Sequence, residues 1–168
     1  KITNNTFRGN GAGISLRSDN THIEDNSFVD NRIAGITLTL SNNNVIKNNT
    51  FENDGLVVFS ESENNTVIDN IVNGQPLVYL EDKSGVEVEN AGQVVLVNSD
   101  HITVTGLDLS NSSGSIQLIG TDNSKIVDNK LNNNDLLGLI LYLSDNNTVR
   151  GNQVSGNSEV GIGISQSK

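Results

Sequence analysis

Apolar residues alternate with polar ones in short runs along the chain, and stretches of Asn, Asp, Ser and Gly separate these runs. Residues 14–16 read Ile-Ser-Leu and residues 36–38 read Ile-Thr-Leu, an alternation typical of β-strands with one buried face. The polar stretches favour tight turns, because Asn, Asp and Gly tolerate left-handed backbone. No window shows the three- and four-residue apolar spacing of a helix. The pattern therefore predicts short strands joined by tight turns.

A unit of about 22 residues repeats along the chain and indicates stacked coils that bury their apolar faces against one another. Each unit reads roughly I-x-x-N-x-F-x-x-N, then G-I-x-L, then S-x-N, and copies begin at Ile2, Ile23, Ile46, Ile126 and Val149. A leucine-rich repeat has an overlapping period, but it needs Leu-dense strands and usually a helical return. We therefore expect an all-β parallel β-helix, a single-stranded solenoid of about eight coils. It would occupy residues 1–168 as one domain, with irregular shorter coils at about 73–104.

Equivalent Asn residues of successive coils are expected to stack at the interstrand spacing of about 4.8 Å. Their amides would bond the turn and the neighbouring amide, which satisfies backbone groups that a bend would otherwise bury unpaired. One predicted column is Asn5, Asn26, Asn49, Asn70, Asn129 and Asn152; the other is Asn20, Asn43, Asn64, Asn123 and Asn146, with Ser99 replacing Asn in one coil.

Both ends of the sequence fall inside repeats. Lys1 stands directly before Ile2, and the chain stops shortly after Ile164. The end coil of a solenoid exposes core and strand edges, so natural solenoids carry polar caps. Neither end reads as a cap, and we expect an excerpt of a longer chain with flanking domains.

The composition of the chain argues against several classes of binding partner. Twenty acidic and ten basic residues give a net charge of −10, which argues against binding to nucleic acid or to an anionic membrane. The chain has no Cys and hence no disulfide or thiol chemistry. No apolar run approaches the about 20 residues of a membrane span, so we expect no membrane insertion. Five N-x-[ST] sequons, which the repeat itself tends to produce, are candidate N-glycosylation acceptors: Asn4, Asn48, Asn64, Asn111 and Asn146.

The units T-H-I-E-D-N-S-F, N-V-I-K-N-N-T-F and N-N-T-V-R-G-N, and more specifically the stretch from Asn73 to Val104, resemble the NosD-type family. This family comprises NosD-type and related carbohydrate-binding and sugar-hydrolase repeats of right-handed parallel β-helices. The resemblance covers essentially the whole chain. It implies a right-handed coil, an extracellular, cell-surface or periplasmic location and polysaccharide-related roles, and for true NosD proteins a part in copper-site maturation.

The copper interpretation finds few ligands in the sequence. Copper sites use Cys, Met or clustered His, whereas the chain has no Cys, no Met and only two histidines, His22 and His101. These precede strands several coils apart and would not share an ion. We expect both to be turn or surface residues, and we predict no metal and no other cofactor.

Catalysis of polysaccharide cleavage makes its own demands. Glycoside hydrolysis needs two carboxyl groups about 5 to 9.5 Å apart, one with a raised pKa. An Asp directly before the Asn of the first predicted column occurs only as Asp25, Asp69 and Asp128. The first two would lie two coils, roughly 10 Å, apart. Asp100 and Asp108 are the least implausible pair. We interpret all five as solvated turn carboxylates and predict no catalytic residue.

The outward positions of the G-I-x-L strands change character along the chain. If Ile14 and Leu16 point inward, the alternate positions point outward; these are polar or small near the ends and apolar in the middle, except at Gln117. These positions would form a contiguous apolar patch of roughly a few hundred Å², which is large enough to mark a binding site or an interface. Two alternatives are that a neighbouring loop or domain covers the patch, or that the inward and outward positions are exchanged in the irregular coils near Val94. The candidate binding residues are Val57, Phe59, Leu77, Tyr79, Val95, Val97, Ile119, Ile140 and Tyr142.

Two functions fit these observations. The first is a non-catalytic extracellular or cell-surface module, structural or adhesive, that contacts a polysaccharide or a partner protein through the apolar face. Phe59, Tyr79 and Tyr142 would then stack on sugar rings. The second is a carbohydrate-active enzyme, a polysaccharide lyase or a glycoside hydrolase. No column of close carboxylates with a basic neighbour is evident, so the module is favoured.

Overall fold

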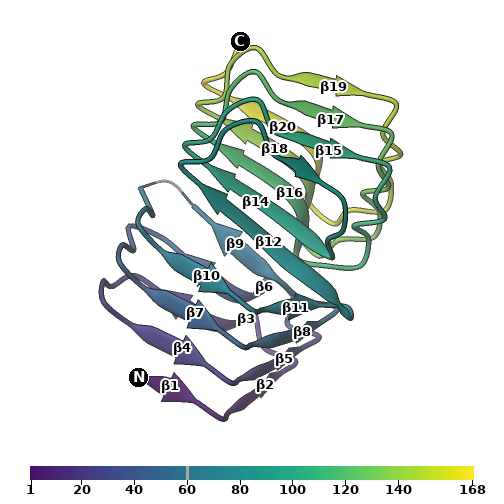
Figure 1. Cartoon of the computed structure of the whole chain (residues 1–168). Coiled ribbons are helices and arrows are strands. Elements are labelled where there is room, and N and C mark those ends of the chain that lie inside the picture. Colours follow the sequence, from purple (N-terminus) through teal and green to yellow (C-terminus); the bar gives the residue numbers. More distant parts are fainter. Residues whose placement is uncertain (60) are drawn as a thin grey trace.

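A computed structural model describes residues 1–59 and 61–168, which form twenty β-strands and no helix (Figure 1). Strands from successive coils pair in parallel with one exception, and this confirms the predicted parallel β-helix. The coils do not form one continuous rod. They form two stacks, which we call the first stack (residues 1–73) and the second stack (residues 74–168), and the second is displaced and tilted relative to the first.

The first stack has three sides. One side is the sheet β1-β4-β7-β10, the next is β2-β5-β8-β11, and the third is β3-β6-β9. The strands are β1 (Ile2–Thr3), β2 (Thr6–Arg8), β3 (Ala12–Leu16), β4 (His22–Glu24), β5 (Ser27–Val29), β6 (Ala34–Leu38), β7 (Val45–Lys47), β8 (Thr50–Glu52), β9 (Leu56–Val58), β10 (Thr66–Ile68) and β11 (Ile71–Val72).

The second stack has two sheets, β12-β14-β16-β18-β20 and β13-β15-β17-β19. Isolated parallel bridges join Asp108, Lys130 and Gln153 on its remaining side. Counted over the described strands, the two stacks make about seven turns, against the eight expected. The strands are β12 (Gln75–Glu81), β13 (Glu87–Val88), β14 (Gln93–Val97), β15 (Thr103–Thr105), β16 (Gly114–Ile119), β17 (Lys125–Val127), β18 (Leu137–Tyr142), β19 (Thr148–Arg150) and β20 (Val160–Ser165).

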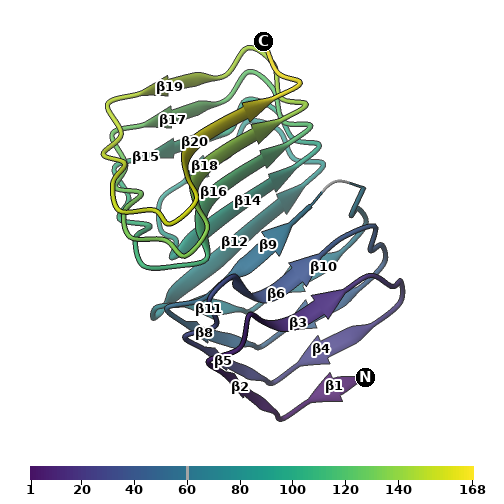
Figure 2. The same cartoon turned by 180° about the vertical axis from the view of Figure 1, so that it is seen from behind.

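A hairpin joins the two stacks. Val72 pairs antiparallel with Gln75 across Asn73 and Gly74, both of which have positive φ, as a two-residue Asn-Gly hairpin requires. The sheet β2-β5-β8-β11 thereby continues into β12-β14-β16-β18-β20 with the strand direction reversed. We call the sheet β12-β14-β16-β18-β20 the second sheet, and Figure 2 shows β9 beside it.

Both faces of the second sheet are therefore used. Because side chains alternate along a strand, Val94 and Leu96 point into the core of the second stack, whereas Leu77, Val95 and Val97 belong to the core of the first stack. One face of the sheet builds its own solenoid, and the other closes the end of the neighbouring one.

Aromatic stacking organises the first stack. The rings of Phe7, Phe28 and Phe51 stack with centroids 5.0 and 4.9 Å apart. The glycine of the G-I-x-L motif lies against this column, since a Cβ on Gly13 would come within 2.7 Å of Phe28, and one on Gly35 within 2.6 Å of Phe51. The repeat therefore needs glycine there for packing.

The first predicted Asn column is confirmed within each stack. The Asn26 and Asn49 amides accept hydrogen bonds at 3.0 Å from the backbone N–H of Asn5 and Asn26 respectively, and the Asn152 amide accepts one at 2.9 Å from that of Asn129. The column breaks between Asn70 and Asn129, where the stacks meet.

The second predicted column is wrong by one residue. Asn20, Asn43 and Asn64 are exposed and occupy left-handed turn positions, with φ between 56° and 57°. The amides that bond across coils belong to the residues that follow two of them, Asn44 and Asn65. Asn in the repeat thus has two roles, because one Asn adopts the turn conformation and its neighbour bonds the next coil.

Ser99 is also displaced from its expected column. It joins a hydroxyl column with Thr121, Ser144 and Ser167, each hydroxyl accepting a hydrogen bond from the backbone N–H of the coil before it. The coil that includes β13 is short: Lys83 bonds Ser99 over 16 residues, whereas Thr121 bonds Ser144 over 23.

Candidate functional site

The structure divides the nine candidate binding residues between two environments. Leu77, Val95 and Val97 lie in the core of the first stack, with Tyr79 packed against it, and Val57 is only 1% exposed. The expectation that the whole set forms an exposed stripe is wrong for these five. Leu77, Tyr79, Val95 and Val97 do point away from the second stack's core, but the first stack of the same chain covers them. Val57 belongs to β9 of the first stack, lies outside that core cluster and borders the same cavity as Gln117 and Ile140.

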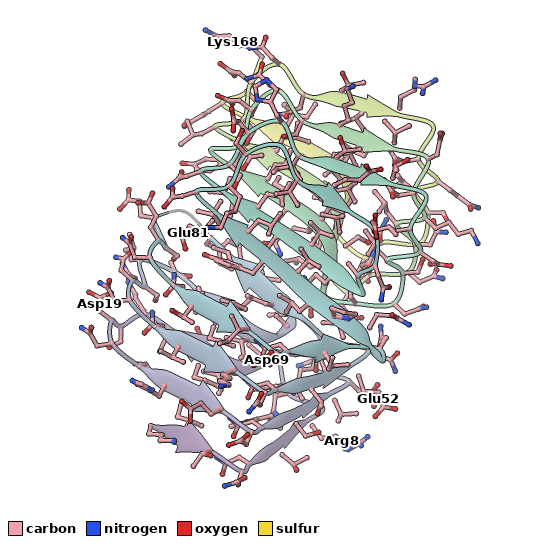
Figure 3. All side chains as sticks on the ribbon, in the orientation of Figure 1. Arg8, Asp19, Glu52, Asp69, Glu81 and Lys168 are labelled. Carbon is pink, nitrogen blue, oxygen red and sulfur yellow. The ribbon has the colours of Figure 1, made fainter. Side chains whose placement is uncertain are left out.

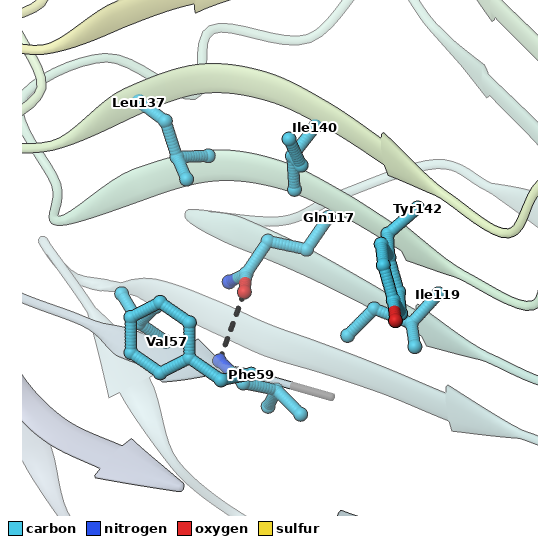
Figure 4. A pocket seen from close by; sticks show the side chains of 8 residues that line it. Val57, Phe59, Gln117, Ile119, Leu137, Ile140 and Tyr142 are labelled. Carbon is cyan, nitrogen blue, oxygen red and sulfur yellow. Dashed lines mark hydrogen bonds between the residues drawn. The ribbon is translucent and has the colours of Figure 1, made fainter. Parts of the chain in front are cut away.

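The other four residues keep part of their side chains in solvent, although Ile119, like Tyr79, also packs against the core of the first stack. Together with Val57 they line a cavity of about 270 Å³ between β9 and the outer face of β16 and β18, which we call the notch (Figure 4). It lies where the first stack ceases to cover the second sheet. The lining comprises Val57, Val58, Phe59, Gln117, Ile119, Leu137, Ile140 and Tyr142.

Two glutamine side chains form the boundary between the stacks. The Leu56 N–H donates to Gln93 Oε1 (2.9 Å), and Gln93 Nε2 donates to the Leu56 carbonyl oxygen (2.8 Å). The Val58 N–H donates to Gln117 Oε1 (2.9 Å), and Gln117 Nε2 donates to the Leu56 carbonyl oxygen (2.8 Å). These carboxamides bond β9 as a further parallel strand would. Gln117, the polar interruption of the predicted stripe, is therefore a structural residue whose amide oxygen and nitrogen both have a main-chain partner.

The mouth of the notch is apolar. Phe59 is 43% exposed, and Tyr142 and Ile140 are half-buried. Leu143 follows Tyr142 and is 50% exposed, while Leu40 lies one residue beyond the coil neighbour of Phe59 and is 38% exposed. Both leucines have positive φ, 51° and 50°, which is uncommon for a bulky side chain. Sequence reasoning missed these two residues, because they lie after the strands rather than within them.

Tyr79 and Glu81 act at the junction rather than at the surface. The Tyr79 hydroxyl donates to Glu81 Oε2 (3.0 Å), and the same carboxylate accepts from the backbone N–H groups of Asn64 and Asn65. Burial, with the negative charge of Glu81 beside it, raises the pKa of the Tyr79 phenol. Figure 3 shows Glu81 where the stacks meet, whereas Asp19 and Lys168 project from the outer surface.

Two carboxyl groups with a raised pKa lie outside the notch lining, and sequence reasoning identified neither. Asp54 is fully buried and accepts hydrogen bonds from Asn31 N–H (3.0 Å) and from the Ser113 hydroxyl (3.4 Å). Burial raises the pKa of Asp54 to about 6. The pKa of Asp135 is also raised, by burial and by the charge of Asp30. Asp54 ends an Asn column of the first stack, and its burial keeps it from acting on a substrate.

The carboxylates considered for catalysis do not have the properties of a general acid. Hydrogen bonds from Ser84 and His101 lower the pKa of Asp100, and bonds from Ser110 lower that of Asp108. Asp25 and Asp69 are exposed and stand on either side of Asn48 in an outer column. A glycosidase acid needs a raised pKa, so this geometry does not supply one.

The histidines do not assemble a copper site. His22 Nδ1 lies 3.3 Å from Glu24 in the first stack, and His101 Nδ1 lies 2.7 Å from Asp100 in the second. Over residues 1–59 and 61–168, no group of three or more His, Cys, Asp and Glu side chains is placed to hold a metal ion. With neither Cys nor Met in the chain, the residues present do not fit copper.

All five sequon asparagines are exposed and have φ between 54° and 60°. Glycosylation at Asn4, Asn48, Asn64, Asn111 and Asn146 stays a prediction. In the part of the chain that the structure describes, no helix is long and apolar enough to cross a membrane.

Two family models match the chain, each over more than half of its length. A model described as a right-handed β-helix region matches residues 1–93, and a model described as periplasmic copper-binding protein (NosD) matches residues 78–168. No curated protein matches. The two matches overlap across β12 to β14, where the first stack meets the second.

Proposed function

The chain belongs to the NosD-like family of right-handed β-helix proteins, and from this premise we propose that it acts outside the cytoplasm as a non-catalytic module. The module contacts a partner protein through the notch. The periplasmic description of the second family model supports the location. Copper has no part in the proposal, because the two histidines lie in different stacks.

The single observation that carries the proposal is the chemistry of the notch lining. Its polar side-chain groups are the amide of Gln117, which is already bonded to Leu56 and Val58, and the hydroxyl of Tyr142; the rest of the lining is hydrocarbon. A sugar needs hydrogen-bond partners for its hydroxyl groups, since buried polar groups without partners cost free energy. An apolar protein side chain needs none. The lining therefore supports a protein partner over a polysaccharide.

Selection from a displayed random peptide library tests the proposal. The wild-type chain serves as bait, and a Phe59→Ala/Tyr142→Ala variant serves for counter-selection. The matched control is Ile33→Ala, because Ile33 is 43% exposed like Phe59. Ile33 precedes β6 whereas Phe59 follows the paired strand β9, so the two residues lie at opposite ends of these strands. We expect peptides that bind the wild type and the control but not the double variant.

A glycan and polysaccharide panel completes the test. Enrichment that the double variant retains would contradict the proposal, because the notch would then not be the contact. Glycan binding lost in the double variant and kept in Ile33→Ala would replace the protein partner with a polysaccharide. Circular dichroism and thermal melting of each variant establish that loss of binding is not loss of folding.

A further inference from the structure

We infer that the notch receives one aromatic side chain from a positively charged segment of the partner. The inference rests on the proposed function and specifies the chemistry of the contact. Five features of the molecule support it: the size and walls of the notch, the bonded state of its edge, the continuity of its floor with an apolar interface, two exposed leucines, and the charges of neighbouring segments.

The notch has the dimensions of a pocket for one ring system. An apolar cavity of about 150 Å³ already holds benzene, and the notch measures about 270 Å³. Phe59 and Tyr142 present their rings on two sides of it, with Gln117 between them and Ile119 beside Tyr142 (Figure 4). Aromatic pairs gain free energy beyond that of their buried area when rings meet edge to face or offset. Such walls favour an aromatic guest over an aliphatic one.

Backbone pairing is not the mode of recognition here. A peptide can add a strand where a sheet edge has free N–H and C=O groups. On β9 the N–H groups of Leu56 and Val58 are already bonded to Gln93 and Gln117. No buried side-chain N or O atom in the described residues lacks a partner. Recognition must therefore come from an inserted side chain.

The floor of the notch continues an interface already present in the molecule. The face of the second sheet that carries Val95 and Val97 packs against the core cluster of the first stack, which includes Phe28 and Phe51. Along the same sheet, the equivalent positions on β16 and β18 line the notch, and of these Gln117 bonds β9. The covered part of this face packs into an apolar core that contains phenylalanine. The uncovered part has the same chemistry and the same kind of occupant.

The rim supports a contact as well. Leu40 and Leu143 are held at positive φ with much of their side chains in solvent. Strained, exposed apolar residues gain little for folding, and residues of this kind concentrate at functional sites. Leu143 directly follows the lining residue Tyr142, and Leu40 lies in the coil whose Leu38 carbonyl bonds Phe59, so they extend the apolar surface available to the segment that carries the aromatic side chain.

The acidic residues near the notch favour basic residues on either side of the inserted aromatic side chain. Glu61 and Glu63 follow Phe59 along the chain, and Asp82 follows Glu81 at the junction; all three are exposed. Arg17 and Lys83 offset part of this charge, but the chain as a whole carries −10. A negative surface accelerates the encounter with cationic segments and slows that with anionic ones, most strongly at low salt.

The chain contains no Trp, so the fluorescence of a tryptophan peptide reports its binding directly. The probes are Lys-Lys-Trp-Lys-Lys and Glu-Glu-Trp-Glu-Glu, with Lys-Lys-Leu-Lys-Lys as a competitor. We expect a blue shift for the first probe, with affinity at least about tenfold weaker in Phe59→Ala/Tyr142→Ala. Ile33→Ala should bind like the wild type. Ile140→Phe, which fills the notch without removing an apolar group, should also block binding.

Each remaining outcome has a defined meaning. Equal affinity for the Leu and Trp peptides would overturn the aromatic specificity and leave the proposed partner contact intact. Equal affinity for the Lys-flanked and Glu-flanked probes would overturn the charge assignment. A blue shift that persists in both the double variant and Ile140→Phe would place binding elsewhere and overturn the inference. Absence of a shift in folded wild-type chain overturns it too, and the display selection then decides separately whether any protein segment binds.

Discussion

The two stacks use the same repeat but treat the outward positions of its longest strand in different ways. In the first stack this column begins in solvent, with Ser15 exposed, and becomes buried at Val57. In the second stack the column begins at half-buried Tyr79, is fully buried at Val95, and is half-buried again at Ile140. Alternation along a strand determines which face a side chain occupies. Whether that face meets water depends on what the rest of the chain places against it.

The polar columns of the stacks end differently as well. Within each stack, one coil bonds the next through Asn, Ser or Thr. At the top of the first stack, the bonding groups are Gln93, Gln117 and Glu81 from the second stack, together with Asp54 bonded to Ser113. An end of a solenoid exposes unpaired edges, and here side chains of the neighbouring stack pair them.

The largest test of this comparison places a charge at equivalent outward positions. Val95→Asp buries an unpaired carboxylate in the core of the first stack, because Val95 has no exposed surface. We expect the free energy of unfolding to fall by about 4 kcal/mol or more. Ser15→Asp lies in solvent and should change it by less than about 0.5 kcal/mol. Urea titrations of both variants measure the difference, and equal losses would mean that the stacks do not cover one another.

A second test removes one of the bonding amides. Gln93→Leu retains an apolar side chain of similar length but leaves the Leu56 N–H and the Gly114 carbonyl oxygen without the partners they have in the wild type. Each buried group left unpaired costs about 1–3 kcal/mol, so we expect a loss of about 2–5 kcal/mol. Hydrogen exchange at the Leu56 amide should accelerate more than exchange in β16. Unchanged protection at Leu56 would contradict the assigned bond.

A third test uses pH. Burial raises the pKa of Asp54 to about 6 from 3.8, so folding favours the neutral carboxyl group. The stabilising contribution is complete below about pH 4 and is lost as pH rises through 6, by about 2–3 kcal/mol. Asp54→Asn continues the column of Asn10 and Asn31 without a charge and should be more stable than the wild type at pH 8. Melting curves from pH 4 to pH 8 check this, and parallel pH profiles for the two proteins would refute it.

The smallest expected effect concerns the turn after β18. Leu143 is held at φ 51° and is half exposed, and Gly120 occupies the equivalent turn one coil earlier. Leu143→Asn removes backbone strain of about 1 kcal/mol, so the melting temperature should rise by a few degrees. Affinity for an aromatic peptide should fall at the same time. A lower melting temperature would show that Leu143 contributes packing that outweighs its strain.

The repeat pattern was sufficient to predict the parallel β-helix, because the spacing of Ile, Phe and Gly within one unit directly reflects strands, core and turns. It also predicted the Asn5 column, since that Asn follows the first strand of each unit. The Asn20 column was misplaced because adjacent Asn residues look identical in sequence, and only the backbone distinguishes the turn residue from the bonding one.

The junction was not predictable in the same way. Asn73-Gly74 is a hairpin signal, but nothing local indicates that the strand after it would start a second stack. The outward stripe was correctly phased around Val95, yet its burial depends on contacts with residues more than 30 positions away, such as Phe51. Gln117 was interpreted as an interruption of the apolar stripe, although its amide oxygen accepts a hydrogen bond from Val58, the last residue of β9.

The glutamine pair has a consequence for how such a protein can vary. On β9, Gln93 and Gln117 bond main-chain atoms alone, and main-chain atoms are the same in every coil. The connection is therefore indifferent to how many coils lie beneath it. Insertion or deletion of a whole unit in the first stack would leave the attachment and the notch unchanged. The length of one arm could change in evolution or by design while the attached recognition surface keeps its shape.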